Sequence, residues 1–157
     1  IRSPQLLEQR RSEGRTEQPA AVVVSRSPDF SSAWRFFNQP LQRWLLAPEP
    51  VDQGFDRWFP LAPTWPERLQ ALGAAGIQRL VLLGGAQLSA DLLQADCVDA
   101  LQLTLVPQLL GGRFSWLPCT NAPLPAALAQ PGAWQSEGAE DLGDGEWLVR
   151  YRRIRSG

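Results

Sequence analysis

The residues best suited to chemistry form a diglycine segment, Leu83-Gly84-Gly85-Ala86-Gln87-Leu88. An apolar run precedes the segment and a helical pattern follows it, which predicts a turn from a strand into a helix. The start of a helix presents unpaired backbone amides and the positive end of the helix dipole, and glycines let a phosphate approach without a Cβ clash. The segment therefore indicates a diphosphate site, although a plain tight turn explains the same two glycines.

A second polar segment, Ser25-Arg26-Ser27, follows the apolar run 22–24. An Arg guanidinium can bind a phosphate through two hydrogen bonds, and serine hydroxyls can add further ones. Taken alone, the segment favours an ordinary polar turn.

The other charged and thiol residues favour structural roles. The arginines near the C-terminus fit the solvated face of a terminal strand, where they balance the acids between residues 137 and 146. A turn cap and a surface acid explain Asp96 and Asp99 better than an acid–base pair does. Cys97 and Cys119 have no activating neighbour in the sequence, so both are interpreted as structural. The arginines concerned are Arg150, Arg152, Arg153 and Arg155.

The composition excludes several classes of enzyme. The 157 residues contain no His, and all fifteen basic residues are Arg. A Ser-His-Asp triad, a His-ligated metal, a phosphate-loop lysine and Schiff-base chemistry are therefore absent from this chain. Two cysteines are too few for a thiolate zinc site. Chemistry carried by a bound cofactor or by carboxylates remains, or no chemistry at all.

Charge and hydropathy set the expected surroundings. The formal net charge of −1 predicts no strong attraction to nucleic acid or to a membrane surface. The sequence has no run of eighteen apolar residues and no signal-peptide core at its start, so we expect a cytoplasmic protein. It contains no Met and begins with Ile1, which suggests that an upstream piece is absent.

Alternating strands and helices predict an α/β fold with helices on the faces of a sheet. Helices are expected at 5–11, at 64–76, where Thr64 and Glu67 form a capping box, and at 86–94. Strands are expected at 20–25, 43–47, 58–61, 77–83, 98–106 and 147–152, the first of them buried on both faces, and residues 118–145 are interpreted as loop or meander. The strand–helix–strand part between 77 and 106 should form a right-handed crossover.

In order and spacing, these segments resemble the reductase domain of the bifunctional riboflavin-biosynthesis deaminase-reductase. The resemblance rests on Gln18-Pro19 before the first strand, Gly76-Ile77 and Leu83-Gly84-Gly85-Ala86 around a later one, and then Leu92-Leu93, Val98-Asp99 and Leu110-Gly111-Gly112. It implies a dihydrofolate reductase-like, three-layer α/β/α fold with a mostly parallel central sheet. Residues 1–157 would form a single reductase-like domain whose N-terminal strands are missing.

The same resemblance implies an NADPH-dependent reductase. Members reduce the ribosyl group of 5-amino-6-(5-phosphoribosylamino)uracil or a related compound to ribityl by hydride transfer, and commonly pair as homodimers. No nucleic-acid or membrane partner is expected, because of the net charge of −1. Arg2 and Leu83 would bind the substrate, Arg2 through its phosphate. The cofactor would contact Ser25, Gly85, Ala86, Gln87, Leu88, Ser89, Ala90 and Asp91.

The sequence departs from the family pattern at two positions, and the first of them, Leu83, motivates an alternative. The family usually has Glu before its diglycine, where this chain has Leu83, and Ala100 replaces an acid that often follows Val-Asp. A non-catalytic domain that keeps the fold for ligand binding or dimerisation is therefore the second hypothesis. An anion- or nucleic-acid-binding module that uses the C-terminal arginines is a more distant third.

Overall fold

A computed structural model describes residues 1–157 except 28, 52–53, 84, 110–116, 118–122 and 156–157. The chain divides into two compact units, Ile1–Ile77 and Gln78–Gly157, and each unit is described by itself. A single domain over residues 1–157 stays a prediction.

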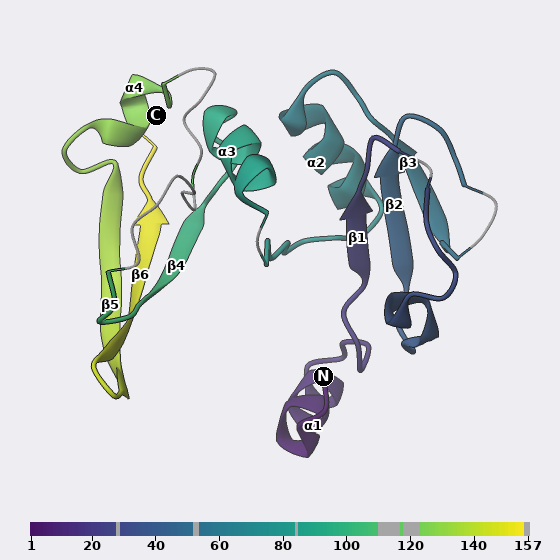
Figure 1. The fold of residues 1–157 in the computed structure, drawn as a ribbon, viewed down its shortest axis with the longest axis horizontal. Helices are drawn as coiled ribbons and strands as arrows, with labels where there is room; N and C mark the ends of the chain where they lie inside the picture. The colour runs from purple at the N-terminus through teal and green to yellow at the C-terminus, as the bar shows by residue number, and fades with distance from the viewer. Residues whose placement is uncertain (28, 52–53, 84, 110–116, 118–122, 156–157) are drawn as a thin grey trace. The chain divides into compact units, whose positions relative to one another are not determined.

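The first unit is built around a parallel sheet. Strands β1 (Ala21–Val24), β2 (Arg43–Ala47) and β3 (Arg57–Pro60) lie side by side in the order β1-β2-β3 (Figure 1). Val23 pairs with Leu45, and Leu45 with Trp58. These three strands confirm the predictions for the first half of the chain, and their parallel pairing confirms an α/β fold.

Strand β2 forms the core of this unit. Its residues from Trp44 to Ala47 are all buried, as expected for a central strand covered on both faces. The prediction that residues 22–24 are buried on both faces is wrong, because β1 is only half-buried. In the described sheet β1 lies at an edge with β2 as its neighbour, so its other side has no paired strand there.

Helices α1 (Pro4–Ser12) and α2 (Trp65–Ala74) confirm two further predictions. The Glu67 amide donates to the Thr64 hydroxyl, and the Thr64 amide donates to the Glu67 carboxylate, so the capping box is complete. Hydrogen bonds to the Glu67 carboxylate from the Thr64 hydroxyl, at 2.8 Å, and from the Thr64 amide hold the pKa of Glu67 below its ordinary value. Helix α2 contacts β3 and buries Leu72. A short 3-10 helix, η1, spans Arg35–Asn38.

The second unit has a different sheet. Strands β4 (Ala100–Leu105), β5 (Trp134–Gly143) and β6 (Glu146–Arg153) form an antiparallel sheet with β6 in the middle (Figure 1). Helix α3 (Ala86–Gln94) precedes β4, and the short helix α4 (Ala126–Ala129) precedes β5. The expected parallel pairing therefore holds for the first sheet and not for the second.

The interpretation of residues 118–145 as loop or meander is wrong in the second half of this segment, which contains strand β5. Its hairpin with β6 turns through Asp144 and Gly145, which have φ of +53° and +80°. Positive φ at both central residues is typical of a tight hairpin turn, and Asp-Gly is a strong sequence signal for one. That dipeptide, just before the apolar alternation of β6, was the signal that sequence reasoning missed.

The predicted strand at 77–83 is wrong. Residues 78–83 are not in a strand, and Val81 and Leu83 are 76% and 94% exposed. The apolar run has strand length and composition, but a strand forms only where a neighbouring strand takes up its backbone hydrogen bonds. No described strand pairs with this run, so the crossover predicted between 77 and 106 is absent as well.

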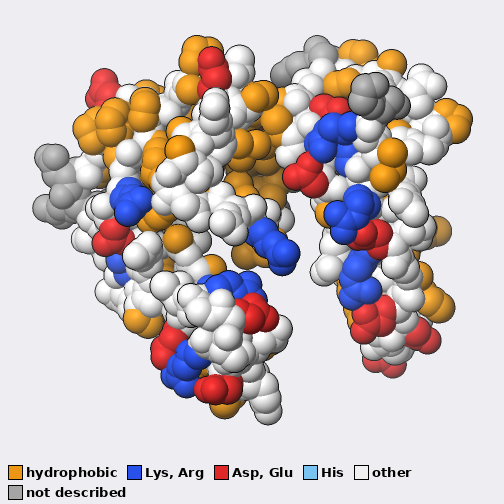
Figure 2. Space-filling model, turned by 180° about the vertical axis from the view of Figure 1, so that it is seen from behind, with side chains coloured by type: hydrophobic (Ala, Val, Ile, Leu, Met, Phe, Trp, Pro, Cys, Tyr) orange, Lys and Arg blue, Asp and Glu red, His pale blue; other side chains and the backbone are white. Residues whose placement is uncertain are grey.

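The C-terminal arginines follow two patterns. Arg150 pairs with Glu140 at 2.7 Å and Arg152 pairs with Glu137, which confirms that acids of the preceding strand balance a solvated face. Figure 2 shows basic and acidic side chains of this unit next to one another rather than in separate patches. Arg153 contradicts the prediction, because it is buried. In the described part of the chain, no helix has the length and apolar character needed to cross a membrane.

Candidate functional site

The candidate site begins where helix α3 begins. Gly85 is the N-cap residue, with φ of +94° and ψ of +93°. Its carbonyl accepts the first helical hydrogen bond, from the Ser89 amide at 2.9 Å. This left-handed backbone conformation strains any residue that carries a Cβ, so the position requires glycine. The diglycine prediction is thus confirmed at Gly85 as a turn into a helix, while Gly84 lies outside the described residues.

The first turn of α3 has free hydrogen-bonding capacity. No side chain caps the helix, and its first turn contains no acidic residue. The amides of Ala86, Gln87 and Leu88 therefore lack a side-chain acceptor among the described residues. Gly85 and Gln87 are exposed. Uncapped amides and the positive end of the dipole together favour an anion at this position.

The predicted cofactor residues from Gly85 to Asp91 share this helix start. The Gln87 amide nitrogen donates to the Asp91 carboxylate at 2.9 Å, an i to i+4 contact along the helix. Leu92 and Leu93, which follow Asp91 directly, are buried. The structure thus brings seven predicted residues together on the first two turns of α3, but it does not test their contact with a cofactor.

Ser25 lies at the end of β1 in the first unit. Its amide donates to the Leu46 carbonyl at 3.1 Å. Its hydroxyl donates to the Ser27 carbonyl at 2.7 Å and accepts from the Ser27 amide at 3.2 Å. These bonds close the polar turn that the sequence favoured at this place. Contact between Ser25 and a cofactor stays a prediction.

The two predicted substrate residues are exposed. Arg2 precedes α1 in the first unit, and Leu83 precedes the diglycine in the second. An alkyl side chain at position 83 cannot accept a hydrogen bond, so it cannot perform the role of a carboxylate there. Both assignments stay predictions.

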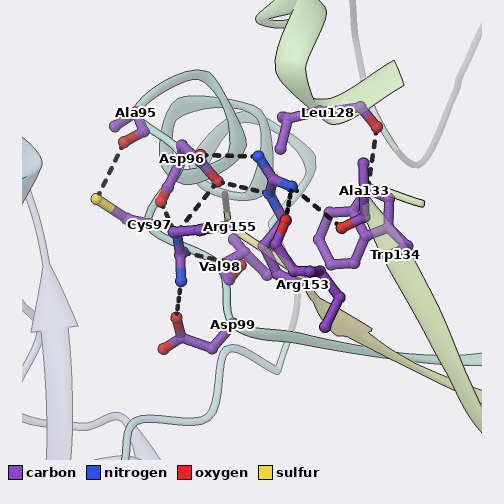
Figure 3. Close-up of polar contacts among 11 residues, drawn as sticks. Ala95, Asp96, Cys97, Val98, Asp99, Leu128, Ala133, Trp134, Arg153 and Arg155 are labelled. Atoms are coloured by element: carbon purple, nitrogen blue, oxygen red, sulfur yellow. Dashed lines mark hydrogen bonds and ion pairs between the residues drawn. The ribbon is translucent and has the colours of Figure 1, made fainter. Parts of the chain in front are cut away.

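The other end of α3 carries a cluster that sequence reasoning did not find (Figure 3). Arg153 Nε and Nη2 donate to the two carboxylate oxygens of Asp96, each at 3.0 Å, and the Arg153 side chain is only 4% exposed. The hydrogen bonds from Arg153 lower the pKa of Asp96. The interpretation of Asp96 as a turn residue is confirmed, and that of Asp99 as a surface acid agrees with its exposed carboxylate beside Arg155.

The thiol in this cluster is structural. Burial raises the pKa of Cys97, and its sulfur donates to the Ala95 carbonyl at 3.3 Å. A raised pKa leaves less thiolate at neutral pH, which is unfavourable for a nucleophile. Cys119 lies outside the described residues. Within the described ranges, no three His, Cys, Asp or Glu residues group as metal ligands.

Comparison with known proteins places the chain in one family. The family model described as the RibD C-terminal domain matches residues 2–143. A curated relative from Haemophilus influenzae, riboflavin biosynthesis protein RibD, is 30% identical over 133 residues. That match covers 81% of this chain and 35% of the relative, so the chain spans about a third of the relative's length.

Solved structures show the same fold at lower identity. A pyrimidine reductase-like protein from Corynebacterium diphtheriae matches with a TM-score of 0.79 and 18% identity, over 99% of this chain and 69% of that one. RibD from Acinetobacter baumannii matches with a TM-score of 0.68 and 21% identity, over 85% of this chain and 37% of that one. These likenesses support the dihydrofolate reductase-like expectation for the fold.

Proposed function

Because the chain belongs to the RibD C-terminal domain family of riboflavin biosynthesis, we propose that it is an NADPH-dependent reductase. Its substrate would be 5-amino-6-(5-phosphoribosylamino)uracil or a closely related compound, whose ribosyl group becomes ribityl. The observation that carries the proposal is the uncapped start of α3 behind Gly85.

The residues at this helix start fit a dinucleotide. A diphosphate carries negative charge and several acceptor oxygens, and the first turn of α3 offers amide donors with no competing acid. Gly85 adds no Cβ on the approach to these amides. We therefore assign the diphosphate of NADPH to the amides of Ala86, Gln87 and Leu88.

The bound cofactor supplies the hydride, and the protein supplies placement and electrostatics. In this proposal the α3 amides hold the diphosphate, and Ser25 faces the cofactor from the end of β1. Arg2 binds the substrate phosphate, for which a guanidinium is well suited because it can donate two parallel hydrogen bonds. Leu83 contacts the substrate without a hydrogen bond.

Leu83 also supports the second candidate function. Its side chain is 94% exposed and apolar, where a reductase of this family would use a carboxylate toward substrate. A non-catalytic domain would keep NADPH or another anionic ligand at α3 and show no turnover. Binding and turnover therefore have to be measured separately.

Titration of the full chain with NADPH tests binding. Reduced nicotinamide absorbs where tryptophan emits, so a bound cofactor should quench the emission of the seven tryptophans. Saturable quenching by NADPH, with NADPH consumption on addition of the phosphoribosylaminouracil substrate, is the expected result. Quenching without consumption favours the non-catalytic domain, and the absence of saturable quenching contradicts both forms of the proposal.

A homodimer is the expected assembly, and the cytoplasm the expected location. The homodimer comes from the family resemblance. Sedimentation of the full chain at several concentrations checks the first: a mass of twice 17.4 kDa supports the dimer, and 17.4 kDa at every concentration contradicts it.

A further inference from the structure

All three longer helices of the described chain end in the same way. The residue after the C-cap has positive φ, and its amide donates to the carbonyl three residues earlier. The next amide donates to the carbonyl five residues earlier, which completes a Schellman motif. The residues with positive φ are Gly14 after α1, Gly76 after α2 and Asp96 after α3, with φ of +67°, +107° and +48°.

Asp96 is the exception among these three residues. Glycine is the usual residue at this position because the left-handed conformation disfavours a Cβ. Asp tolerates that conformation better than most residues, but at a cost that Gly14 and Gly76 do not have. The contact with Arg153 explains why Asp, and not glycine, occupies position 96.

Several hydrogen bonds hold the Arg153 side chain and backbone in place. It makes two parallel hydrogen bonds with the Asp96 carboxylate, and its Nη1 donates to the Ala133 carbonyl at 3.1 Å (Figure 3). The Arg153 backbone amide donates to the Asp99 carbonyl at 2.8 Å. Arg153 is the last residue of β6, so these bonds join the sheet to the end of α3. We call the paired side chains the Asp96–Arg153 clamp.

The clamp holds the C-terminal end of helix α3, opposite the first turn that would bind the diphosphate. A helix of nine residues is about 13 Å long. A change of about 10° in its direction would move the first turn by about 2 Å if the C-terminal end were fixed. Displacements of about 1 Å already impair binding and catalysis where geometry matters. The direction of α3 thus determines where the amides of Ala86 and Gln87 lie.

We propose that Asp96 and Arg153 are positioning residues that set the direction of α3, and through it the place of the amides that receive the diphosphate of NADPH. The inference rests on the proposed function. In this proposal Asp96 and Arg153 act through the direction of the helix and not by contact with the cofactor. The clamp fixes the C-terminal end of the helix, and the N-terminal end binds the diphosphate.

Two Asp→Gly substitutions separate positioning from turn stability. Asp96→Gly removes the carboxylate and places the residue usual for the turn at position 96, so the turn itself is retained or improved. Asp144→Gly is the matched control, because Asp144 also has positive φ and lies in the same unit, at the β5–β6 hairpin. Both changes relieve the same backbone conformation, and only the first breaks the clamp.

Hydrogen exchange without cofactor is the first measurement. The proposal predicts faster exchange of the α3 amides in Asp96→Gly, by about tenfold or more, and no change in Asp144→Gly. Equal exchange in the two variants overturns the clamp, whatever the chain binds. The result of this hydrogen-exchange measurement therefore does not depend on whether the proposed function is correct.

NADPH titration is the second measurement. The dissociation constant should rise about tenfold in Asp96→Gly and stay unchanged in Asp144→Gly, at a temperature well below the melting transitions of both variants. Arg153→Lys keeps the charge but not the two parallel bonds, so its dissociation constant should lie between those of Asp96→Gly and the parent chain. Unaltered affinity in Asp96→Gly overturns the proposal, and no binding by the parent chain overturns the proposed function together with it.

Discussion

The amide of Ser89 donates to the carbonyl of Gly85 at 2.9 Å, and this bond is the first of helix α3. The amides of the three residues between them point toward the N-terminal end of the helix, where no described side chain caps them. The exposed start of a helix, opened by a glycine of positive φ, is the structural basis of the proposed dinucleotide site.

Gly85→Ala should weaken NADPH binding. Alanine is strained at φ of +94°, by about 1–2 kcal/mol, so the helix start adjusts and its amides move away from the diphosphate. A rise of about tenfold in the dissociation constant is expected from a strain of this size. Fluorescence titration measures it.

Gly132→Ala is the matched control for this change. Gly132 has φ of +81° in the turn before β5, and a Cβ there meets no neighbour, so the backbone penalty is similar. Affinity should be unchanged in Gly132→Ala. If both variants bind NADPH like the parent chain, the start of α3 is not the site.

The stability contributed by Asp96 should depend on pH. The hydrogen bonds from Arg153 lower the pKa of Asp96 in the folded chain, whereas an unfolded Asp titrates near pH 3.9. The pair therefore stabilises fully above that value and loses its contribution as the pH falls through the lowered pKa. Arg155 also pairs with this carboxylate, at 3.6 Å, and the Cys97 thiol interacts with it electrostatically.

Asp96→Asn isolates this contribution. Urea unfolding at pH 7 should show a lower free energy of unfolding in the variant, and the difference from the parent chain should shrink below about pH 4. Asp144→Asn, in the hairpin turn, is the control. A difference that is the same at pH 7 and pH 3 would contradict the ion pair as its origin.

Leu45→Ala should destabilise the first unit strongly. Leu45 is fully buried at the centre of β2, and loss of a buried leucine side chain costs about 2–5 kcal/mol. Leu6→Ala, at a side chain that is 50% exposed on α1, should change the free energy of unfolding by less than about 0.5 kcal/mol. Equal effects at the two positions would show that β2 is not the core.

Thr64→Ala should destabilise α2 by about 1 kcal/mol, because the amide at the third helical position loses its acceptor. Thr64→Ser keeps a hydroxyl at the N-cap and serves as the control. Thermal unfolding followed by circular dichroism distinguishes them. A serine variant as unstable as the alanine variant would contradict the role of the cap.

Local signals predicted much of this fold. Thr64 and Glu67 located the start of α2 because both halves of a capping box lie within four residues of sequence. The run 43–47, stopped by Pro48, indicated the buried central strand correctly. Gly85 marked the start of α3, because a helix that opens from positive φ needs glycine.

Long-range partners were harder to predict. The run 77–83 has the composition of a strand, yet composition does not say which strand would pair with it. Arg153 looks like its neighbours Arg150 and Arg152 in the sequence, but its partner Asp96 is 57 positions away. Alternation along β6 could not show which arginine is buried, and the clamp became visible only in the structure.

The most direct test of the dinucleotide site follows individual backbone amides during an NADPH titration by ¹H–¹⁵N NMR. We predict that the amides of Gly85, Ala86, Gln87 and Leu88 show the largest shifts and that these shifts saturate with the tryptophan quenching. Saturable binding that leaves these four amides unmoved, or no binding at all, would contradict the assignment of the dinucleotide to helix α3.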